Sequence, residues 1–342
     1  MSKVLETKEV ICKICGKPLE IIEFGEADDR MVDYVHPKCA EPLAVGSTAP
    51  SPRPFSDLLK LAEDTIAYAR RALPVEVEPD LAHAEQSGKY LVLLGFAHKM
   101  LKSTEAVTLL CRNGYGEDAA IVTRSIVEAV IHAGRIESLP PEEGAKRWGA
   151  YMIALQWRLY LRWKKLLEDD PEQLEQVFTP ESVQKHKDEF TEELQDWFII
   201  DRGTGLNDPG NISKTWLTRR TAEGKLKQED IYEMARKLDG IEQQRRKLGK
   251  YDGYRTLVQT AYDFGSNYAH SNTLAVEKYS IKTEDGNFTF QSLPSKRYVS
   301  HSLWSTIGGL IQMLHIVNRV NPLEDGEELA SLSKRWCQVI ED

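Results

Sequence analysis

The sequence predicts a mainly α-helical fold, a multi-helix bundle with an N-terminal zinc finger and a small β-hairpin insertion. From Ser56 onward, apolar residues recur at helical spacing almost without interruption. Before that point, "CKIC" and "HPKC" supply two closely spaced pairs of metal-binding residue types. Late in the chain, "YSIKTEDGNFTFQS" alternates around Asp285 and Gly286, which is typical of a β-hairpin.

The composition is that of a folded soluble protein. The chain has 342 residues, 41% of them hydrophobic. No apolar run approaches the roughly 18 residues that span a bilayer, and the N-terminus "MSKVLETKEV" has no apolar segment that could act as a signal peptide. We therefore expect a cytoplasmic protein with no membrane partner. The net charge of −9 argues against a chain that coats nucleic acid with its whole surface, but it leaves room for a local basic groove.

A linker rich in Pro, Ser and Gly divides the chain. The segment "EPLAVGSTAPSPRPFSD" has the composition of an interdomain connection. We expect a zinc finger over residues 1–41, a linker over 42–55 and a helical bundle domain over 56–342, with the hairpin near 279–292.

The bundle domain divides into helices at capping residues and breakers. Ser56 is a suitable N-cap, the Asn113-Gly114 pair closes a helix, and Pro140-Pro141 stops the next one. The predicted helices cover 57–73, 81–114, 117–138, 142–169, 297–320 and 326–340.

Two stretches of the bundle domain carry further expectations. In the helix over 142–169, apolar residues at helical spacing predict a buried stripe. Residues 201–227 break the helical pattern with four glycines and a proline, which is typical of a disordered or functional segment such as a lid. The predicted stripe comprises Trp148, Met152, Leu155, Leu159, Trp163 and Leu166.

The N-terminal segment has the spacing of a zinc site. Cys12 and Cys15 form one pair, and His36 and Cys39 form a second pair twenty residues on. Four such ligands can close a tetrahedron around Zn²⁺ and leave no open position, so the zinc would be structural. A redox Cys-x-x-Cys motif is the alternative. The pattern resembles treble-clef and half-LIM zinc fingers over residues 10–41, and the acidic surplus of this segment favours docking to a protein or to the helical domain itself.

A second constellation lies in the bundle domain. Stepping back from His270 by fours gives Ser266 and Tyr262, and continuing by three and four gives Gln259 and Arg255, so one helix face collects these polar residues.

The helix over 117–138 has a matching stripe. Arg124, Glu128 and His132 stand four residues apart amid Ala, Ile and Val. Buried charges must be paired, so we expect Arg124 and Glu128 to bind each other or polar partners on the helix that carries His270. The two stripes form either an active site or a buried polar network that fixes the register of two helices.

The stretches "GEDAAIVTRSIVEA" and "YDFGSNYAHSN" resemble a family of uncharacterised bacterial helical domains. The resemblance covers roughly residues 56–275 and rests on an Arg-Ser-x-x-Glu helix and a later Tyr/Ser/His-Ser helix. Members of that family usually have Pro after the histidine, where this chain has Ser271. The positions that the resemblance implies are Arg124, Ser125, Glu128, Tyr262, Ser266, His270 and Ser271.

The helical domain is also similar to HEPN ribonucleases, in which an Arg and a His separated by four to six residues act on RNA. This chain departs from that spacing, because seven residues separate Arg124 from His132, and the one Arg-x5-His match, Arg30 to His36, falls on a zinc ligand. The resemblance implies a metal-independent ribonuclease of a bacterial defence or toxin system.

In that interpretation Arg124 would stabilise phosphate charge and His270 would take a proton from the 2′-hydroxyl. Glu128 and Ser266 complete the expected catalytic set, and Tyr262 and Ser271 are expected to bind substrate. The alternative is a non-catalytic adaptor that binds a protein or nucleic-acid partner. Both interpretations allow RNA or a protein as the partner, and both allow a homo-oligomer.

Overall fold

The computed structural model describes residues 55–78, 84–201, 207–221, 225–247, 253–262, 265–266, 269, 280–282, 288–290 and 298–341. These residues are mainly helical, which confirms the helical part of the predicted class, and residues 1–41, predicted as a zinc finger, lie outside the described ranges. Residues 55–337 form one compact unit. Among the helices described, none combines the length and the apolar character that a membrane crossing requires.

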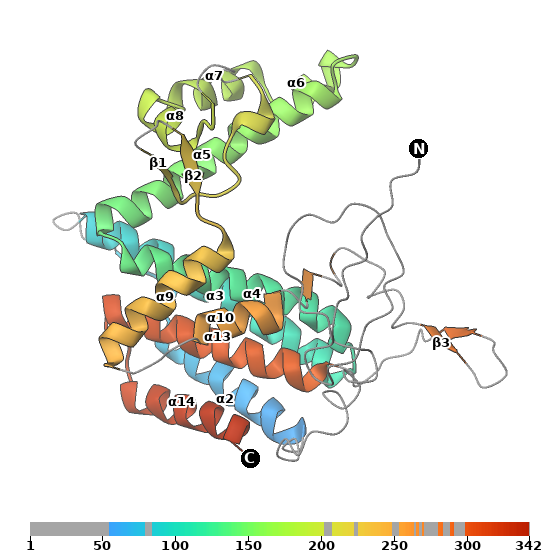
Figure 1. The fold of residues 1–342 in the computed structure, drawn as a ribbon, viewed down its shortest axis with the longest axis vertical. Helices are drawn as coiled ribbons and strands as arrows, with labels where there is room; N and C mark the ends of the chain where they lie inside the picture. The colour runs from blue at the N-terminus through green and yellow to red at the C-terminus, as the bar shows by residue number, and fades with distance from the viewer. Residues whose placement is uncertain are drawn as a thin grey trace, which may run out of the picture. The chain divides into compact units, whose positions relative to one another are not determined.

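Three long helices make the centre of the bundle. They are α3 (Ala84–Arg112), α4 (Gly116–Ser138) and α13 (Val299–Val320), and each packs on the other two (Figure 1). Helices α4 and α13 approach closely at Gly309. A Cβ at this position would lie only 2.9 Å from Cγ2 of Ile126. The hydroxyls of Thr123 and Thr306 meet at 2.9 Å in this interface, so a buried hydrogen bond fixes its register.

Two amphipathic helices cover one side of this centre. Helix α2 (Phe55–Ala72) packs on α13 and α3, and α14 (Gly326–Glu341) joins α2 through ion pairs of Arg71 with Glu328 and of Arg335 with Asp64.

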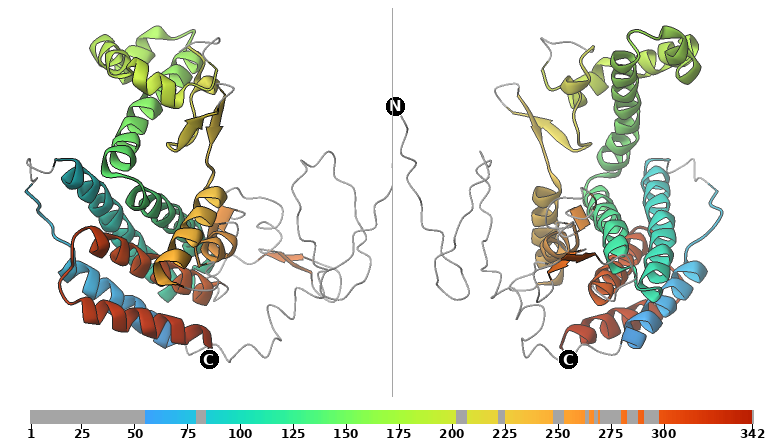
Figure 2. Two further views of the ribbon diagram at one scale, coloured as in Figure 1. Left: turned by 60° about the vertical axis from the view of Figure 1, so that its left-hand side comes forward. Right: turned by 90° about the vertical axis from the view of Figure 1, so that its right-hand side faces the viewer.

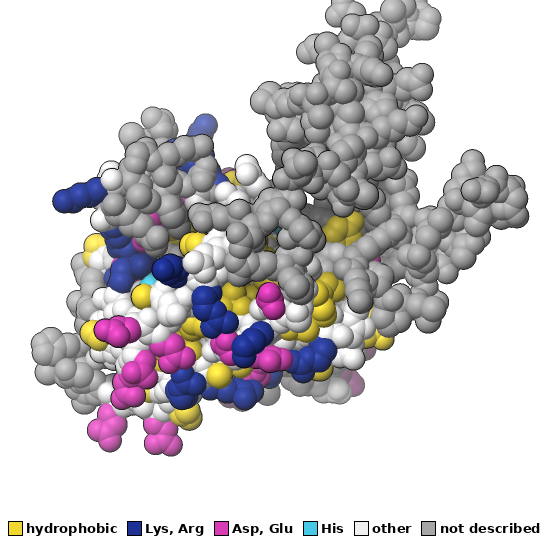
Figure 3. Space-filling view, turned by 90° about the horizontal axis from the view of Figure 1, so that it is seen from below, with side chains coloured by type: hydrophobic (Ala, Val, Ile, Leu, Met, Phe, Trp, Pro, Cys, Tyr) yellow, Lys and Arg dark blue, Asp and Glu magenta, His cyan; other side chains and the backbone are white. Residues whose placement is uncertain are grey.

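Figure 3 shows basic and acidic side chains interspersed on one face of the molecule. No single-sign surface is visible there among the described side chains.

On the other side, α4 is covered by α9 (Ile231–Arg246) and a π-helical segment, η3 (Val258–Tyr262), and α10 (Gly253–Leu257) packs on both of these. The Asp239 carboxylate of α9 accepts hydrogen bonds from the backbone N–H groups of Tyr254 and Arg255 and from Nε of Arg255. It thereby caps α10 and fixes the start of the segment that leads to Tyr262.

Helix α5 (Pro141–Leu166) leads away from this centre and carries small elements, as Figure 2 shows. Part of the 201–227 stretch, predicted as irregular, contributes a short antiparallel ladder, in which Arg219 pairs with Lys227. The elements packed along α5 are α6 (Pro171–Val177), α7 (Pro180–Glu189), α8 (Glu192–Phe198) and η2 (Pro209–Asn211), and the ladder of β1 (Thr218–Arg220) and β2 (Leu226–Gln228) packs on α8 through β1.

The predicted buried stripe of α5 is wrong. Met152, Leu159 and Leu166 are exposed, Trp148, Leu155 and Trp163 are partly exposed, and the buried residues precede the predicted ones by one or two positions. Both faces of this helix carry apolar residues, so the periodicity could not select the face that packs. The residues that are buried instead are Ala150, Tyr151, Ala154, Trp157 and Leu161.

The predicted ends of two helices are present. Gly114 has φ 79°, the left-handed conformation expected of a residue that follows a helix end. Helix α4 ends at Ser138, just before the Pro140-Pro141 pair. Strands β3 (Ser280–Lys282) and β4 (Phe288–Phe290) pair antiparallel within the segment predicted as a hairpin, and the residues between them lie outside the described ranges.

Gly265 allows the chain after η3 to lie against α4. A Cβ at this position would be 2.5 Å from the carbonyl oxygen of Ala120 and 2.8 Å from Cβ of Arg124. The backbone of α4 cannot move away without disturbing its packing on α3 and α13. Glycine at this position therefore lets the two motif segments touch.

We expect Gly265→Ala to lower the free energy of unfolding by about 1–3 kcal/mol, because the added methyl group must separate the two segments. The control is Gly240→Ala in α9, where a Cβ meets no atom within 4 Å. That change should be neutral or stabilise the protein by up to about 1 kcal/mol through helix propensity. Chemical denaturation of both variants tests this, and equal effects would contradict the close contact at Gly265.

Candidate functional site

Arg124 and Glu128 occupy one face of α4, and the structure pairs them as predicted. The guanidinium lies 3.4 Å from Oε1 of Glu128. The pair is open to solvent, since the side chain of Arg124 is 22% exposed and that of Glu128 is 37% exposed. The expected burial of both charges is therefore only partial.

Tyr262 is the partner of Arg124 on the second motif segment. Its ring lies under the guanidinium at 4.8 Å, and its hydroxyl lies 3.5 Å from the same group. The Nε–H of Arg124 is buried and has no acceptor among the described residues. The arginine is thus held by an aromatic face and one carboxylate, with hydrogen-bonding capacity left over.

The expected continuation of this face to Gln259 and Arg255 is wrong. The π-helical turn adds a residue to the helix and shifts its phase just before Tyr262. Arg255 binds Asp239, and Arg255 and Gln259 line a separate hollow with Lys227 and Arg236.

His132 continues the α4 stripe and binds a residue that is distant in sequence. Its Nδ1 accepts a hydrogen bond of 2.9 Å from Nε1–H of Trp216. The indole can only donate, so Nδ1 must be unprotonated and a neutral ring carries its proton on Nε2. No described residue accepts from that Nε2–H.

Burial, with a smaller contribution from the positive charge of Lys99, lowers the pKa of His132 to about 4. The ring is therefore neutral at physiological pH. A neutral ring with Nδ1 occupied and Nε2 protonated is a hydrogen-bond donor and has no free lone pair to act as a base.

These residues surround a cavity of about 330 Å³, which we call the tryptophan pocket. Glu128 and His132 of α4 line it together with Trp148 and Tyr151 of α5. Segments 214–216 and 228–231, with Met234 and Tyr262, complete its wall. Trp148 and Trp216 meet edge to face at 5.7 Å, and His132 lies 5.5 Å from Trp148.

A second hollow of about 480 Å³ adjoins the tryptophan pocket. The two share Glu128, His132 and Trp148, and α3 adds Gly95 and Lys99 to the second one. We call these two adjoining hollows the groove; an acceptor, a donor and an aromatic ring line both of them.

A buried ion cluster supports the far wall of the tryptophan pocket. The Glu229 carboxylate is almost fully buried and binds Arg135 at 3.4 Å and also Lys237. The hydroxyl of Thr215 donates to the Glu229 carbonyl. These bonds connect the β2–α9 junction to α4, so the wall that holds Trp216 is anchored to the bundle.

The other sequence-predicted residues divide into two groups. Ser266 is described, but its hydroxyl donates to the carbonyl of Tyr262 at 2.8 Å, and no contact with Arg124 or Glu128 is seen. Outside the described residues lie His270 and Ser271 of the expected site and the zinc ligands Cys12, Cys15, His36 and Cys39. Among the described residues, no group of three or more His, Cys, Asp or Glu side chains is arranged to hold a metal ion.

Sequence reasoning missed the pocket itself. Trp148 was assigned to the core, and Trp216 lay in a stretch whose glycines indicated a loop. The available signal was His132, a third polar residue at helical spacing on an otherwise apolar face.

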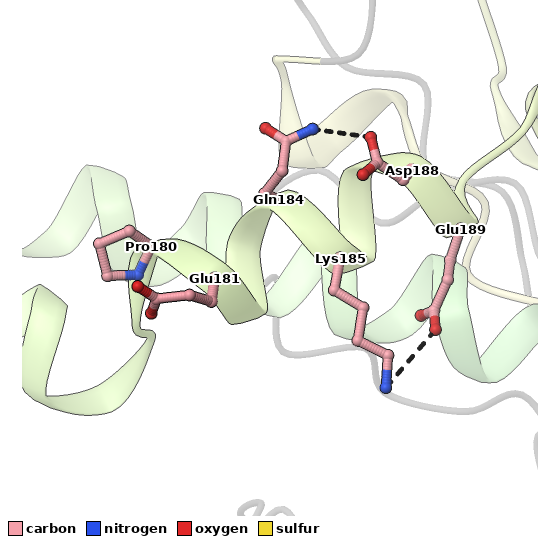
Figure 4. Close-up of a pocket in the computed structure, with 6 residues that line it drawn as sticks. All are labelled: Pro180, Glu181, Gln184, Lys185, Asp188 and Glu189. Carbon is pink, nitrogen blue, oxygen red and sulfur yellow. Dashed lines mark hydrogen bonds and ion pairs between the residues drawn. The ribbon is translucent and has the colours of Figure 1, made fainter.

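A larger hollow of about 770 Å³ lies along α7 and has a different character. It is lined by side chains of that one helix, in which Gln184 binds Asp188 and Lys185 pairs with Glu189 (Figure 4). Neighbours on a single helix satisfy each other there, so this hollow has no convergent groups from other elements and is not a candidate site.

Residues 90–288 match the model of a family of unknown function, DUF5677. The match covers more than half of the chain. The chain belongs to this family. No curated protein and no solved structure matches it significantly. The membership agrees with the resemblance to an uncharacterised helical family, and the DUF5677 segment contains the whole groove, including His132, Trp216 and Tyr262, and also Arg124.

The Trp216–His132 bond predicts a specific loss of stability in acid. The pKa of His132 is lowered on folding, so the neutral ring stabilises the fold fully above the ordinary histidine pKa of about 6.5. As pH falls from about 6.5 toward 4, that contribution is lost. We expect wild type to lose a few kcal/mol more than His132→Gln over this range.

The measurement is the melting temperature of both proteins as a function of pH. His98→Gln removes a histidine that bonds the Pro74 carbonyl from α3 and does not line the groove; it should keep the wild-type pH dependence. Parallel curves for wild type and His132→Gln would contradict the assignment.

Proposed function

We propose that this DUF5677 protein is a HEPN-like, metal-independent ribonuclease that cleaves single-stranded RNA. The observation that carries the proposal is Arg124, a partly exposed guanidinium held over Tyr262 and beside Glu128, next to an aromatic groove. A positioned cation of this kind stabilises the charge that builds on a phosphate during cleavage.

The proposed reaction is an internal transesterification. The 2′-hydroxyl oxygen bonds to phosphorus, the bond to the 5′ oxygen breaks, and the products are a 2′,3′-cyclic phosphate and a 5′-hydroxyl. A base removes the 2′-hydroxyl proton, and water returns a proton to the 5′ oxygen. Arg124 binds the non-bridging phosphate oxygens, and Glu128 and Tyr262 hold Arg124 in place.

His132 does not serve as the base, because Nδ1 is occupied by Trp216 and Nε2 carries the proton. The base we propose is His270, which follows Tyr262 and Ser266 at steps of four in the sequence. The resemblance to HEPN ribonucleases supports a cytoplasmic role in bacterial defence or as a toxin.

We expect purified wild type to cleave a labelled single-stranded RNA without added divalent metal. Arg124→Gln and His270→Ala should each reduce the rate by about 10²- to 10⁴-fold at nearly unchanged melting temperature. The control is Arg112→Gln, which removes an exposed guanidinium paired with Glu63 and should keep full activity. The 2′,3′-cyclic end of the product identifies the mechanism.

Intact RNA with wild type, or cleavage that survives both substitutions, would contradict the proposal. RNA that is bound and left intact would support the alternative of a non-catalytic adaptor. Growth or phage restriction in cells that express wild type or His270→Ala tests the biological role separately.

We also propose that Cys12, Cys15, His36 and Cys39 bind one structural zinc ion, which the paired spacing in the sequence supports. Protein purified without added zinc should contain one zinc per chain, and Cys12→Ser should lose it. Cys337→Ser changes an exposed cysteine far from these positions in the sequence and should retain the metal. Metal analysis decides this, and a Cys12–Cys15 disulfide or the lack of stoichiometric zinc would overturn it.

A further inference from the structure

We infer that the tryptophan pocket binds one unpaired nucleobase of the RNA, so that Glu128, His132 and Trp148 select single-stranded substrate beside Arg124. This inference rests on the proposed function, because it names what the groove recognises. It assigns a binding role to His132, Trp148 and Trp216, which the proposed chemistry does not use.

The walls of the pocket fit a flat aromatic ligand. Trp148 and Tyr262 are partly exposed, and Tyr151 and Trp216 are buried. A volume of about 330 Å³ is within the range of small-ligand sites and exceeds that of one base. Bases stack on such rings whatever their identity, because every base has a π face.

The polar groups of the pocket fit the edge of a base. The Glu128 carboxylate is an acceptor, and one of its oxygens is engaged by Arg124. His132 offers an N–H donor whose tautomer is fixed by Trp216. A donor and an acceptor on neighbouring residues of one helix face match the alternating donors and acceptors of a Watson–Crick edge, which only an unpaired base exposes.

Cations flank the pocket where a sugar–phosphate chain would leave it. Lys214 lines the pocket itself, Lys99 lines the adjoining hollow, and Arg124 binds the shared residue Glu128. An organic cation is the other ligand that aromatic rings and a carboxylate suit. The N–H of His132 and the two lysines disfavour a cation and favour an anionic chain.

The test uses a short 2′-O-methyl oligonucleotide of mixed sequence, which lacks a free 2′-hydroxyl and cannot be cleaved. A matched set replaces each nucleotide in turn by an abasic sugar. Binding is measured by intrinsic tryptophan fluorescence and by anisotropy of a labelled end. One abasic position should weaken binding to wild type by roughly tenfold to hundredfold, the effect of losing one stacked base.

The pocket variants locate that base. In Trp148→Leu, His132→Gln and Glu128→Gln the full oligonucleotide should bind more weakly, and the penalty of the abasic position should shrink or vanish. Trp163→Leu changes another partly exposed tryptophan of α5 that lines neither hollow, and it should keep the wild-type penalty. If a pocket variant fails to fold, the abasic series on wild type and the remaining variants still decides.

The two proposals fail separately. Cleavage of RNA with no penalty at any abasic position, or a penalty that persists in every folded pocket variant, overturns the base pocket and leaves the ribonuclease standing. A base-dependent complex with no cleavage of unmodified RNA overturns the ribonuclease and keeps the pocket. Tetramethylammonium that quenches wild-type fluorescence and displaces the oligonucleotide would assign the pocket to an organic cation and overturn the inference.

Discussion

Helix α4 is enclosed by other helices around most of its circumference, and this enclosure governs the site. Helices α3, α13, α5 and α9 and the η3 segment all pack on it. Most of its apolar residues are thereby buried, and Arg124, Glu128 and His132 lie on a strip that stays partly exposed. Arg124 must then find partners within a narrow space, and Tyr262 and Glu128 supply them. A guanidinium held in this way loses little freedom when it binds an anion, which is the condition for effective charge stabilisation.

The hydrogen bond from Trp216 to His132 gives the pocket its structure and its chemistry together. It connects the segment before β1 to α4, and it requires a neutral imidazole with the proton on Nε2. Burial of the ring favours the same state, since a charged ring would lose solvation there. His132 therefore anchors the wall of the pocket through Nδ1 and also has an N–H donor at Nε2.

Local pairing makes an acidic chain compatible with the anionic substrate that we propose. The net charge is −9, yet the buried carboxylate of Glu229 is neutralised by Arg135 and Lys237, and Glu137 is bound by Arg245 and Arg319. Lys99 and Lys214 line the groove, and Arg124 binds Glu128, which lines both of its hollows. Over distances shorter than the screening length of about 8 Å at physiological salt, these nearby charges outweigh the net charge of the whole molecule.

The sequence by itself determined the helical class, the ends of the helices at Gly114 and before Pro140, and the pairing of Arg124 with Glu128. Each of these depends on neighbours within one or two turns of the chain, so spacing and capping residues are enough. The tertiary structure alone decided which face of α5 is buried, where Tyr262 lies at the end of the π-helical turn, and that Trp216 meets His132 across 84 positions of sequence. Periodicity shows that a helix has apolar and polar faces, but the element that covers each face comes from a distant part of the chain. Exposure, and with it the state of His132 and the openness of the Arg124 pair, therefore follows only from the packed structure.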